Sequence, residues 1–240
     1  MKKIILMFGL LLLFSCSNNE SVNDVSTSGV VLVKKIVYSD GEENTFSYEG
    51  TKLTKINIFG GEYLNITYSG DLIIKTEWFT ANNTPGEKEE FIYSLNKISH
   101  IKFYSSPNKL ESIENYSYSS DGTITIAESY YNSLNILTNS DPRKNYYDTA
   151  GNKIKTEFLQ NNKVVSTLNY AYDTKNSPFK NITGVYVLFL NNDGVGSIIN
   201  NLTNGPNGFK SYQYNSQNYP VSAIETQPVD GSTVTAAYFY

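Results

Sequence analysis

The chain has 240 residues, with 23 acidic side chains, 19 basic ones, one histidine and one cysteine. The acidic excess argues against a nucleic-acid partner and against an electrostatic grip on anionic lipid. One histidine excludes a multi-histidine metal site, and one cysteine excludes an internal disulfide. We therefore expect no metal, no other cofactor, and a fold held together by its core alone.

Residues 1–15 have the layout of a secretory signal peptide, in which Lys2 and Lys3 precede an apolar run from Ile4 to Phe14. At about 1.5 Å per residue, this run spans only about half of a ~30 Å hydrocarbon core, so it is too short for a stable anchor. The run ends in Leu13-Phe14-Ser15-Cys16, which resembles the lipobox of bacterial lipoproteins. That resemblance implies removal of residues 1–15 and acylation of Cys16 with palmitate or similar chains, which makes membrane lipid a partner.

Residues 16–29 follow as the lipidated cysteine and a polar stretch without periodicity. Such a composition is typical of a flexible tether, with a reach of roughly 20 Å. Ser17 is not the aspartate that retains many lipoproteins in the inner membrane, so we expect a lipid-anchored protein of the cell envelope, at the outer membrane. The sequence leaves open whether it faces the surface or the periplasm.

From residue 30 to residue 240 we expect a single β domain, because one short unit recurs along this part of the chain. Each unit has an aromatic or β-branched residue, a spacer, a tyrosine, a polar turn and an apolar residue that opens the next strand. The anchoring tyrosines are 20 to 29 residues apart, at positions 48, 68, 93, 118, 147 and 172. A looser copy contains Tyr212 and Tyr214. That period suits one hairpin per unit.

The residues between the turns alternate between apolar and polar, as in Thr123–Ile126. Such alternation is typical of half-buried strands. We therefore predict an all-β fold, an antiparallel meander of about 12–16 strands built from hairpin repeats. So many strands cannot form one flat open sheet, and we expect the sheet to be curled or barrel-like.

The clearest copy of the unit is Tyr147-Asp148-Thr149-Ala150-Gly151-Asn152-Lys153-Ile154. It resembles the tyrosine-aspartate (YD) repeats of Rhs-type proteins. With the lipobox in front, the chain is similar to repeat-containing lipoproteins of unknown function from Bacteroidetes, some of which are porin-like in fold. The resemblance covers about residues 30–240 and informs the fold more than the function, because the family offers no established active-site residues.

Residues 176–207 interrupt the repeat, since the next anchoring tyrosine is delayed to 42 residues after Tyr172. Within them, residues 185–190 fit either a buried strand or a helical turn, and residues 198–202 fit a short helix. A long insertion in a regular array is a common place for function. The alternative is a plug or cap that covers an edge or an end of the sheet.

Four aromatic residues are candidate ligand-binding side chains: Trp78, Tyr186, Tyr212 and Tyr214. Trp78 suits either a sugar-stacking platform or packing against neighbouring strands. The single His100 fits an ordinary strand residue, residues 191–194 lack the alternating carboxylates of a calcium loop, and Glu87–Glu90 has the composition of a solvated charge cluster.

Two functions from different classes remain. The first is a non-enzymatic binding or surface-structural module that presents a curved aromatic face or residues 176–207 to a glycan or protein ligand. The second is a polysaccharide or cell-wall hydrolase that uses carboxylates in the concavity of the sheet. The C-terminal residues 234–240 alternate and end on an aromatic residue, as in outer-membrane barrels. Charges on both faces of many segments, together with the lipid anchor, argue against a barrel that spans the membrane.

Overall fold

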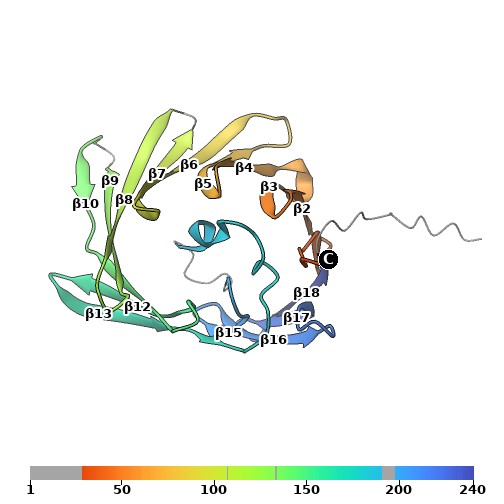
Figure 1. The fold of residues 1–240 in the computed structure, drawn as a ribbon. Coiled ribbons are helices and arrows are strands. Elements are labelled where there is room, and N and C mark those ends of the chain that lie inside the picture. Colours follow the sequence, from red (N-terminus) through yellow and green to blue (C-terminus); the bar gives the residue numbers. More distant parts are fainter. Residues whose placement is uncertain (1–28, 107, 133, 191–197) are drawn as a thin grey trace, which may run out of the picture.

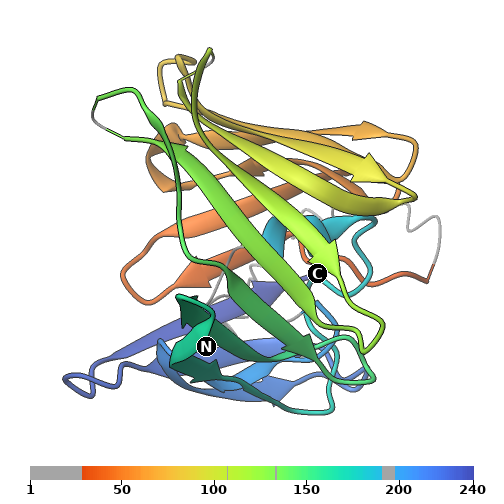
Figure 2. The ribbon, with the colours of Figure 1, turned by 90° about the vertical axis from the view of Figure 1, so that its left-hand side faces the viewer.

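The computed structural model describes residues 29–106, 108–132, 134–190 and 198–240. The predicted signal peptide, Cys16 and residues 17–28 of the predicted tether lie outside the described residues. The described chain forms one antiparallel sheet of eighteen strands that curls into a barrel (Figures 1 and 2). The predicted all-β, barrel-like fold is therefore confirmed.

The strands follow one another around the barrel wall in chain order, apart from one place where two consecutive strands both pair with the strand before them. They are β1 (Lys35–Tyr38), β2 (Glu43–Glu49), β3 (Lys52–Asn57), β4 (Tyr63–Ser69), β5 (Leu72–Phe79), β6 (Pro85–Ser94), β7 (Lys97–Ser106), β8 (Lys109–Tyr118), β9 (Ile124–Tyr131), β10 (Leu137–Asn139), β11 (Arg143–Tyr147), β12 (Lys153–Gln160), β13 (Lys163–Asn169), β14 (Ala171–Tyr172), β15 (Leu202–Gly205), β16 (Gly208–Tyr214), β17 (Pro220–Thr226) and β18 (Thr233–Phe239). The number exceeds the expected 12–16 because short strands such as β10, β14 and β15 have two to four residues each. No helix among the described residues is long and apolar enough to cross a membrane.

The barrel closes where the first and last strands meet. β1 pairs with β2 on one side and with β18 on the other, over residues 35–38 and 236–239. Between β13 and β16 the wall is thinner, because β14 and β15 are joined only through Ala171 opposite Asn204 and Tyr172 opposite Leu202. Neither end of the β1–β18 order is left as an open edge, which avoids an exposed template for aggregation.

The anchoring tyrosines mark β-bulges. The strand register shifts at Tyr48, Tyr68, Tyr93, Tyr147 and Tyr172, although not at Tyr118. A bulge leaves one extra residue on the bulged strand and disturbs the local ladder of hydrogen bonds. The recurring tyrosine in the sequence therefore corresponds to a recurring irregularity of the sheet.

The hydroxyl of a later tyrosine binds the backbone at an earlier bulge. Tyr68 lies opposite Ile73 in the register, and the Ile73 carbonyl accepts a 2.6 Å hydrogen bond from the Tyr93 hydroxyl. The same arrangement recurs with Tyr172 on the Lys153 carbonyl at 2.8 Å. It recurs again with Tyr212 on Leu202 and with Tyr240 on Pro220, both at 2.9 Å. These bonds satisfy buried hydroxyls and link successive hairpins into one wall.

Residues 176–190 and 198–201 lie inside the barrel, and we call them the plug (Figure 1, inside the ring of strands). The plug contains a 3₁₀ helix, η2 (Val185–Phe189), and not the strand that was the alternative for this segment. Residues 198–201 are irregular where a short helix was considered, and residues 202–205 belong to the sheet as β15. The described part of the insertion is thus a luminal segment followed by a wall strand.

The plug packs on the inner face of β2–β9, and plug and wall together form the main core. The buried residues of this core are Leu53, Ile66, Ile73, Phe91, Ile98, Ile101, Tyr116, Ile126, Ile182, Val185, Val187 and Leu190. Polar contacts fix the plug at one end of the barrel, where Thr183 donates from its backbone to the Thr51 carbonyl at 2.9 Å and its carbonyl accepts from the Tyr68 hydroxyl at 3.0 Å. Gly184, with φ +69°, lies against the Asp71 carbonyl, and an added β-carbon would come within 2.8 Å of that oxygen.

Candidate functional site

A cavity of about 220 Å³ lies between the plug and the opposite wall of the barrel. The wall side is formed by β1, β16, β17 and β18, and the plug side by Ser177, Pro178 and Phe179. The side chains on the inner face of this wall include two small ones, because Ala223 on β17 and Ala236 on β18 lie opposite each other in the strand register. The cavity therefore exists where two strands place alanines at inward positions.

An ion pair lines the cavity together with these alanines. Lys210 on β16 and Glu225 on β17 are cross-strand partners, and Nζ of Lys210 lies 2.8 Å from a carboxylate oxygen of Glu225. Their side chains are 16% and 24% exposed, so both are largely shielded from solvent without being sealed in. A shielded ion pair of this kind presents ammonium donors and carboxylate acceptors in one place.

Three tyrosines complete the polar part of the cavity. Burial raises the pKa of Tyr38, Tyr212 and Tyr238, and the negative charge of Glu225 adds to the rise for each of them. All three hydroxyls are therefore protonated at neutral pH. The Tyr212 hydroxyl is already bonded to the Leu202 carbonyl, so this residue offers its ring to the cavity.

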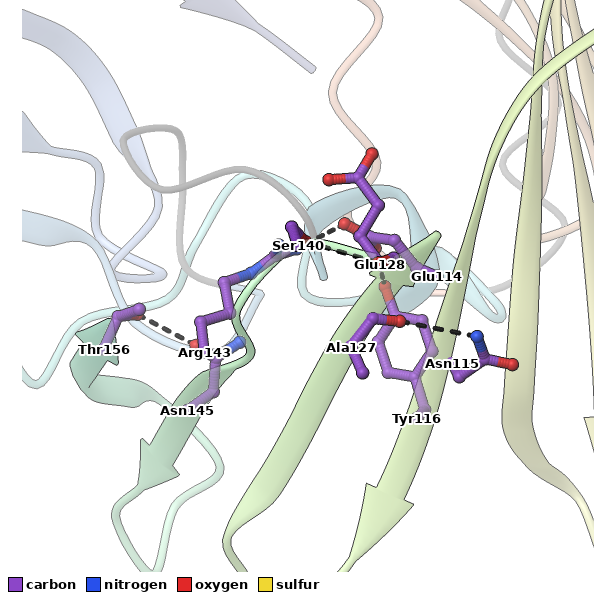
Figure 3. A network of polar contacts seen from close by, with 9 residues as sticks. All are labelled: Glu114, Asn115, Tyr116, Ala127, Glu128, Ser140, Arg143, Asn145 and Thr156. Carbon is purple, nitrogen blue, oxygen red and sulfur yellow. Dashed lines mark hydrogen bonds and ion pairs between the residues drawn. The ribbon is translucent and has the colours of Figure 1, made fainter. Parts of the chain in front are cut away.

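The opposite wall has a separate network of polar contacts, in which Glu114, Tyr116 and Arg143 lie close together (Figure 3). Glu114 on β8 is 5% exposed and is held by Arg143 on β11 at 2.7 Å and by the Tyr116 hydroxyl at 2.6 Å. The register places Glu128 directly opposite Glu114. Both Glu114 oxygens therefore accept a hydrogen bond, one from the Arg143 guanidinium and one from the Tyr116 hydroxyl.

Glu89 on β6 lies near this network. Burial raises its pKa, a hydrogen bond from Thr76 opposes the rise, and the negative charge of Glu114 adds to it. The prediction that Glu87–Glu90 forms a solvated cluster is thus wrong for Glu89, whose side chain points towards the interior of the barrel. Glu90 faces outward and pairs with Lys88 at 2.8 Å.

The structure separates the four aromatic candidates for ligand binding. Tyr212 lines the cavity, and the neighbouring Tyr214 ring has its centroid 6.0 Å away while its hydroxyl bonds Asp173. Trp78 lies on β5 in the other wall, opposite Leu64, and Tyr186 lies in η2 of the plug against the core. Only Tyr212 of the four contributes to the described cavity.

Sequence reasoning missed Lys210, Glu225, Tyr38 and Tyr238. The usable signal was a charged residue at an inward position of an alternating strand, but the inward face cannot be assigned to β16 without knowing where the bulge at Tyr214 falls.

His100 occupies β7 between Ile92 and Asn115, and its Nδ1 lies 3.1 Å from the Ser99 hydroxyl. Within the described ranges, no set of three or more His, Cys, Asp or Glu side chains is arranged to hold a metal ion.

Comparison with known structures identifies similar folds. A porin-like protein from Bacteroides vulgatus superposes with a TM-score of 0.55 at 15% sequence identity, covering 87% of this chain and 98% of its own. A porin-like protein from Bacteroides uniformis has a TM-score of 0.34 at 12% identity, covering 82% and 77%. The TcdB2-TccC3 structure matches with a TM-score of 0.25 at 13% identity, and the match spans only 15% of that longer chain. No protein-family model and no curated protein matches the sequence.

Proposed function

We propose that this chain is an exported, acylated lipoprotein of the cell envelope, anchored at the outer membrane through Cys16, that acts as a non-enzymatic binding module. The observation that carries the proposal is the cavity between the plug and the β1/β16–β18 wall, which combines an ion pair, tyrosine rings and empty space. Binding sites are typically concave, mostly apolar and supplied with a few placed polar groups.

Two features argue against a barrel that spans the membrane and conducts through it, and they are compatible with the proposed anchor. First, the plug occupies the lumen and contributes Val185, Val187 and Leu190 to the core. Second, the outer face of β5 and β6 carries cross-strand pairs of opposite charge, since Lys75 lies opposite Glu90 and Glu77 lies opposite Lys88. Strands that face lipid present an uncharged band to the bilayer instead.

The geometry supports binding over hydrolysis. Glu225 is the one carboxylate among the residues that line the described cavity, whereas glycoside hydrolysis commonly uses two across the scissile bond. Glu114, in the other wall, has its two oxygens engaged by Arg143 and Tyr116. We therefore place the hydrolase alternative second.

The relation to YD-repeat lipoproteins of Bacteroidetes belongs to the same proposal. It is supported by the Tyr147–Ile154 unit, by the recurrence of tyrosines at bulges, and by the overall likeness to the porin-like fold from Bacteroides vulgatus. The likeness to that structure concerns the fold alone.

The anchoring half of the proposal is tested by expressing the full chain and a Cys16→Ser variant in a bacterial host that processes lipoproteins. Metabolic labelling with palmitate and membrane fractionation are the measurements. We expect label and outer-membrane association for the natural chain, and loss of both for Cys16→Ser. Labelling of the Cys16→Ser variant, or ion conductance of the purified natural protein in planar bilayers, would contradict the proposal.

A further inference from the structure

The cavity has chemical features that define its ligand more narrowly. It is electrically balanced, because Lys210 and Glu225 neutralise each other at 2.8 Å. An anionic ligand drawn to Lys210 would meet Glu225, and a cationic ligand drawn to Glu225 would meet Lys210. The pair therefore favours a ligand without net charge.

The ion pair leaves hydrogen-bonding capacity that a ligand must meet. An ammonium has three donors and an ionised carboxylate has about four acceptor sites, and their mutual contact uses one of each. Adjacent hydroxyl groups satisfy both partners, since one hydroxyl donates to the carboxylate while it or its neighbour accepts from the ammonium. A zwitterion fits less well because its own charges compete with the existing pair.

The remaining walls suit the carbon face of a small ring. Tyr38, Tyr212 and Tyr238 border the cavity, and aromatic faces pack well against flat, weakly polar C–H surfaces. At about 220 Å³, the cavity is many times larger than the roughly 10–15 Å³ that can hold one water, which leaves room for about one sugar ring. Ala223 and Ala236 provide that room.

From this balance of charge, hydrogen bonds and size, we infer that the cavity binds a neutral polyhydroxylated ring, such as a single neutral monosaccharide unit of a glycan. The inference rests on the proposed binding function and names its ligand class. Lys210 and Glu225 bind the hydroxyl groups, and the tyrosine rings pack on the carbon face.

The test uses the full mature lipoprotein in detergent micelles, with D-glucose, D-galactose and N-acetyl-D-glucosamine as probes. Glucuronate, glucosamine and glycine serve as the anionic, cationic and zwitterionic comparisons. Saturation-transfer difference NMR detects binding, and titration gives the dissociation constants. We expect at least one neutral sugar to bind in the millimolar range, about tenfold or more tighter than the charged compounds.

Two matched pairs of variants locate the site. Ala236→Val fills the cavity, whereas Ala237→Val adds the same methyl groups on the outer face of the same strand. Glu225→Gln changes the cavity pair, whereas Glu157→Gln changes the Lys155–Glu157 pair of similar 2.7 Å geometry on β12. We expect each cavity variant to weaken sugar binding about tenfold and each control to change it less than about twofold.

Deoxy analogues of the sugar that binds provide a readout that needs no variant, since removal of a recognised hydroxyl weakens binding to the unaltered protein. Equal or tighter binding of a charged compound, equal effects of Ala236→Val and Ala237→Val, or no binding of any neutral sugar would overturn the ligand assignment. Absence of sugar binding by a protein whose Cys16 is acylated refutes only this inference. An unacylated Cys16 refutes only the anchoring proposal.

Discussion

The two halves of the barrel wall are built from the same repeat but enclose different interiors. On the inner face of β2–β9, the inward residues are mostly large and apolar, and they close around the plug. On the inner face of β1 and β16–β18, two inward positions hold alanine and two hold Lys210 and Glu225. The first half is a packed core and the second half borders a cavity.

The comparison indicates that the hairpin repeat specifies the wall, while the inward residue of each strand decides whether the interior is filled. In both halves a tyrosine hydroxyl donates a hydrogen bond to a backbone carbonyl at an earlier bulge. Tyr93 donates to Ile73 in one half, and Tyr240 donates to Pro220 in the other. The frame is therefore the same, and the side-chain volume differs. Four experiments with single substitutions test this comparison, in order of decreasing expected effect.

The largest effect is expected at the β15–β16 turn, which holds the cavity wall in place. Gly208 has φ +120°, and a β-carbon added there would lie 2.0 Å from the Thr226 carbonyl oxygen. We expect Gly208→Ala to lower the free energy of unfolding by about 3–5 kcal/mol, measured by urea denaturation. The control is Gly50→Ala, at φ +62° with open space around the added atom, which should cost only about 1 kcal/mol. Equal losses would show that the close contact is relieved by backbone movement.

The next effect compares the two interiors directly. Ile98 is fully buried in the core against the plug, and we expect Ile98→Ala to destabilise the protein by about 2–5 kcal/mol. Ile36 is also buried but borders the cavity, so part of its packing is already missing and Ile36→Ala should cost about half as much. Thermal and urea unfolding of the two variants measure the difference. A larger loss at Ile36 would mean that the cavity wall is the better packed half.

A smaller effect is expected from the tyrosine hydroxyls that join hairpins. Tyr93→Phe removes the donor to the Ile73 carbonyl and leaves that carbonyl without this bond, which should cost about 1–2 kcal/mol. Tyr63→Phe removes an exposed 3.1 Å bond to Asn83 and should cost at most about 0.5 kcal/mol. Equilibrium unfolding of both variants tests the difference. Indistinguishable values would mean that water replaces the tyrosine at the bulge.

The smallest effect is a dependence on pH. Because burial raises the pKa of Glu89 in the folded protein above its unfolded value, ionisation of Glu89 disfavours the folded state. That penalty is absent below the unfolded pKa and is complete once the pH exceeds the folded pKa. Glu89→Gln should therefore stabilise the protein at neutral pH, with the gain disappearing as the pH falls towards the ordinary range of a glutamate. This gain is measured from unfolding midpoints between acid and neutral pH, with Glu87→Gln as the exposed control. A gain that is constant across pH would exclude the ionisation of Glu89 as its cause.

Much of the fold was predictable from the sequence, for a physical reason. The spacing of the tyrosines and the Gly, Asn and Asp residues between them define hairpins, and positive φ angles at Gly50, Gly70 and Asn96 agree with that assignment. The strand number was underestimated because β10, β14 and β15 are too short to show alternation. The conformation of residues 185–190 was ambiguous because an apolar run of that length fits a strand or a helical turn, and the tertiary packing that distinguishes them is not visible in the sequence.

The cavity was less accessible to sequence reasoning. Its ion pair depends on the register of β16 against β17, and the bulge at Tyr214 shifts that register by one residue. Its space depends on Ala223 and Ala236, and alanine in a strand has no distinctive pattern. Aromatic character alone therefore pointed to Trp78 and Tyr186, which lie in the other wall and in the plug, as well as to Tyr212 at the cavity.

The position where the chain enters the barrel sets the direction from which a ligand approaches. Near the start of β1, the Val31 carbonyl accepts a bond from the plug residue Asn181 at 2.9 Å, so the polypeptide arrives at the plugged end. Lys210 and Glu225 lie towards the other end, near the loop that joins β17 to β18. With Cys16 acylated as proposed, the tether would join the barrel at its plugged end, and the ion pair lies at the end remote from that attachment. A soluble sugar would then reach the cavity by diffusion from the aqueous side, without first partitioning into lipid.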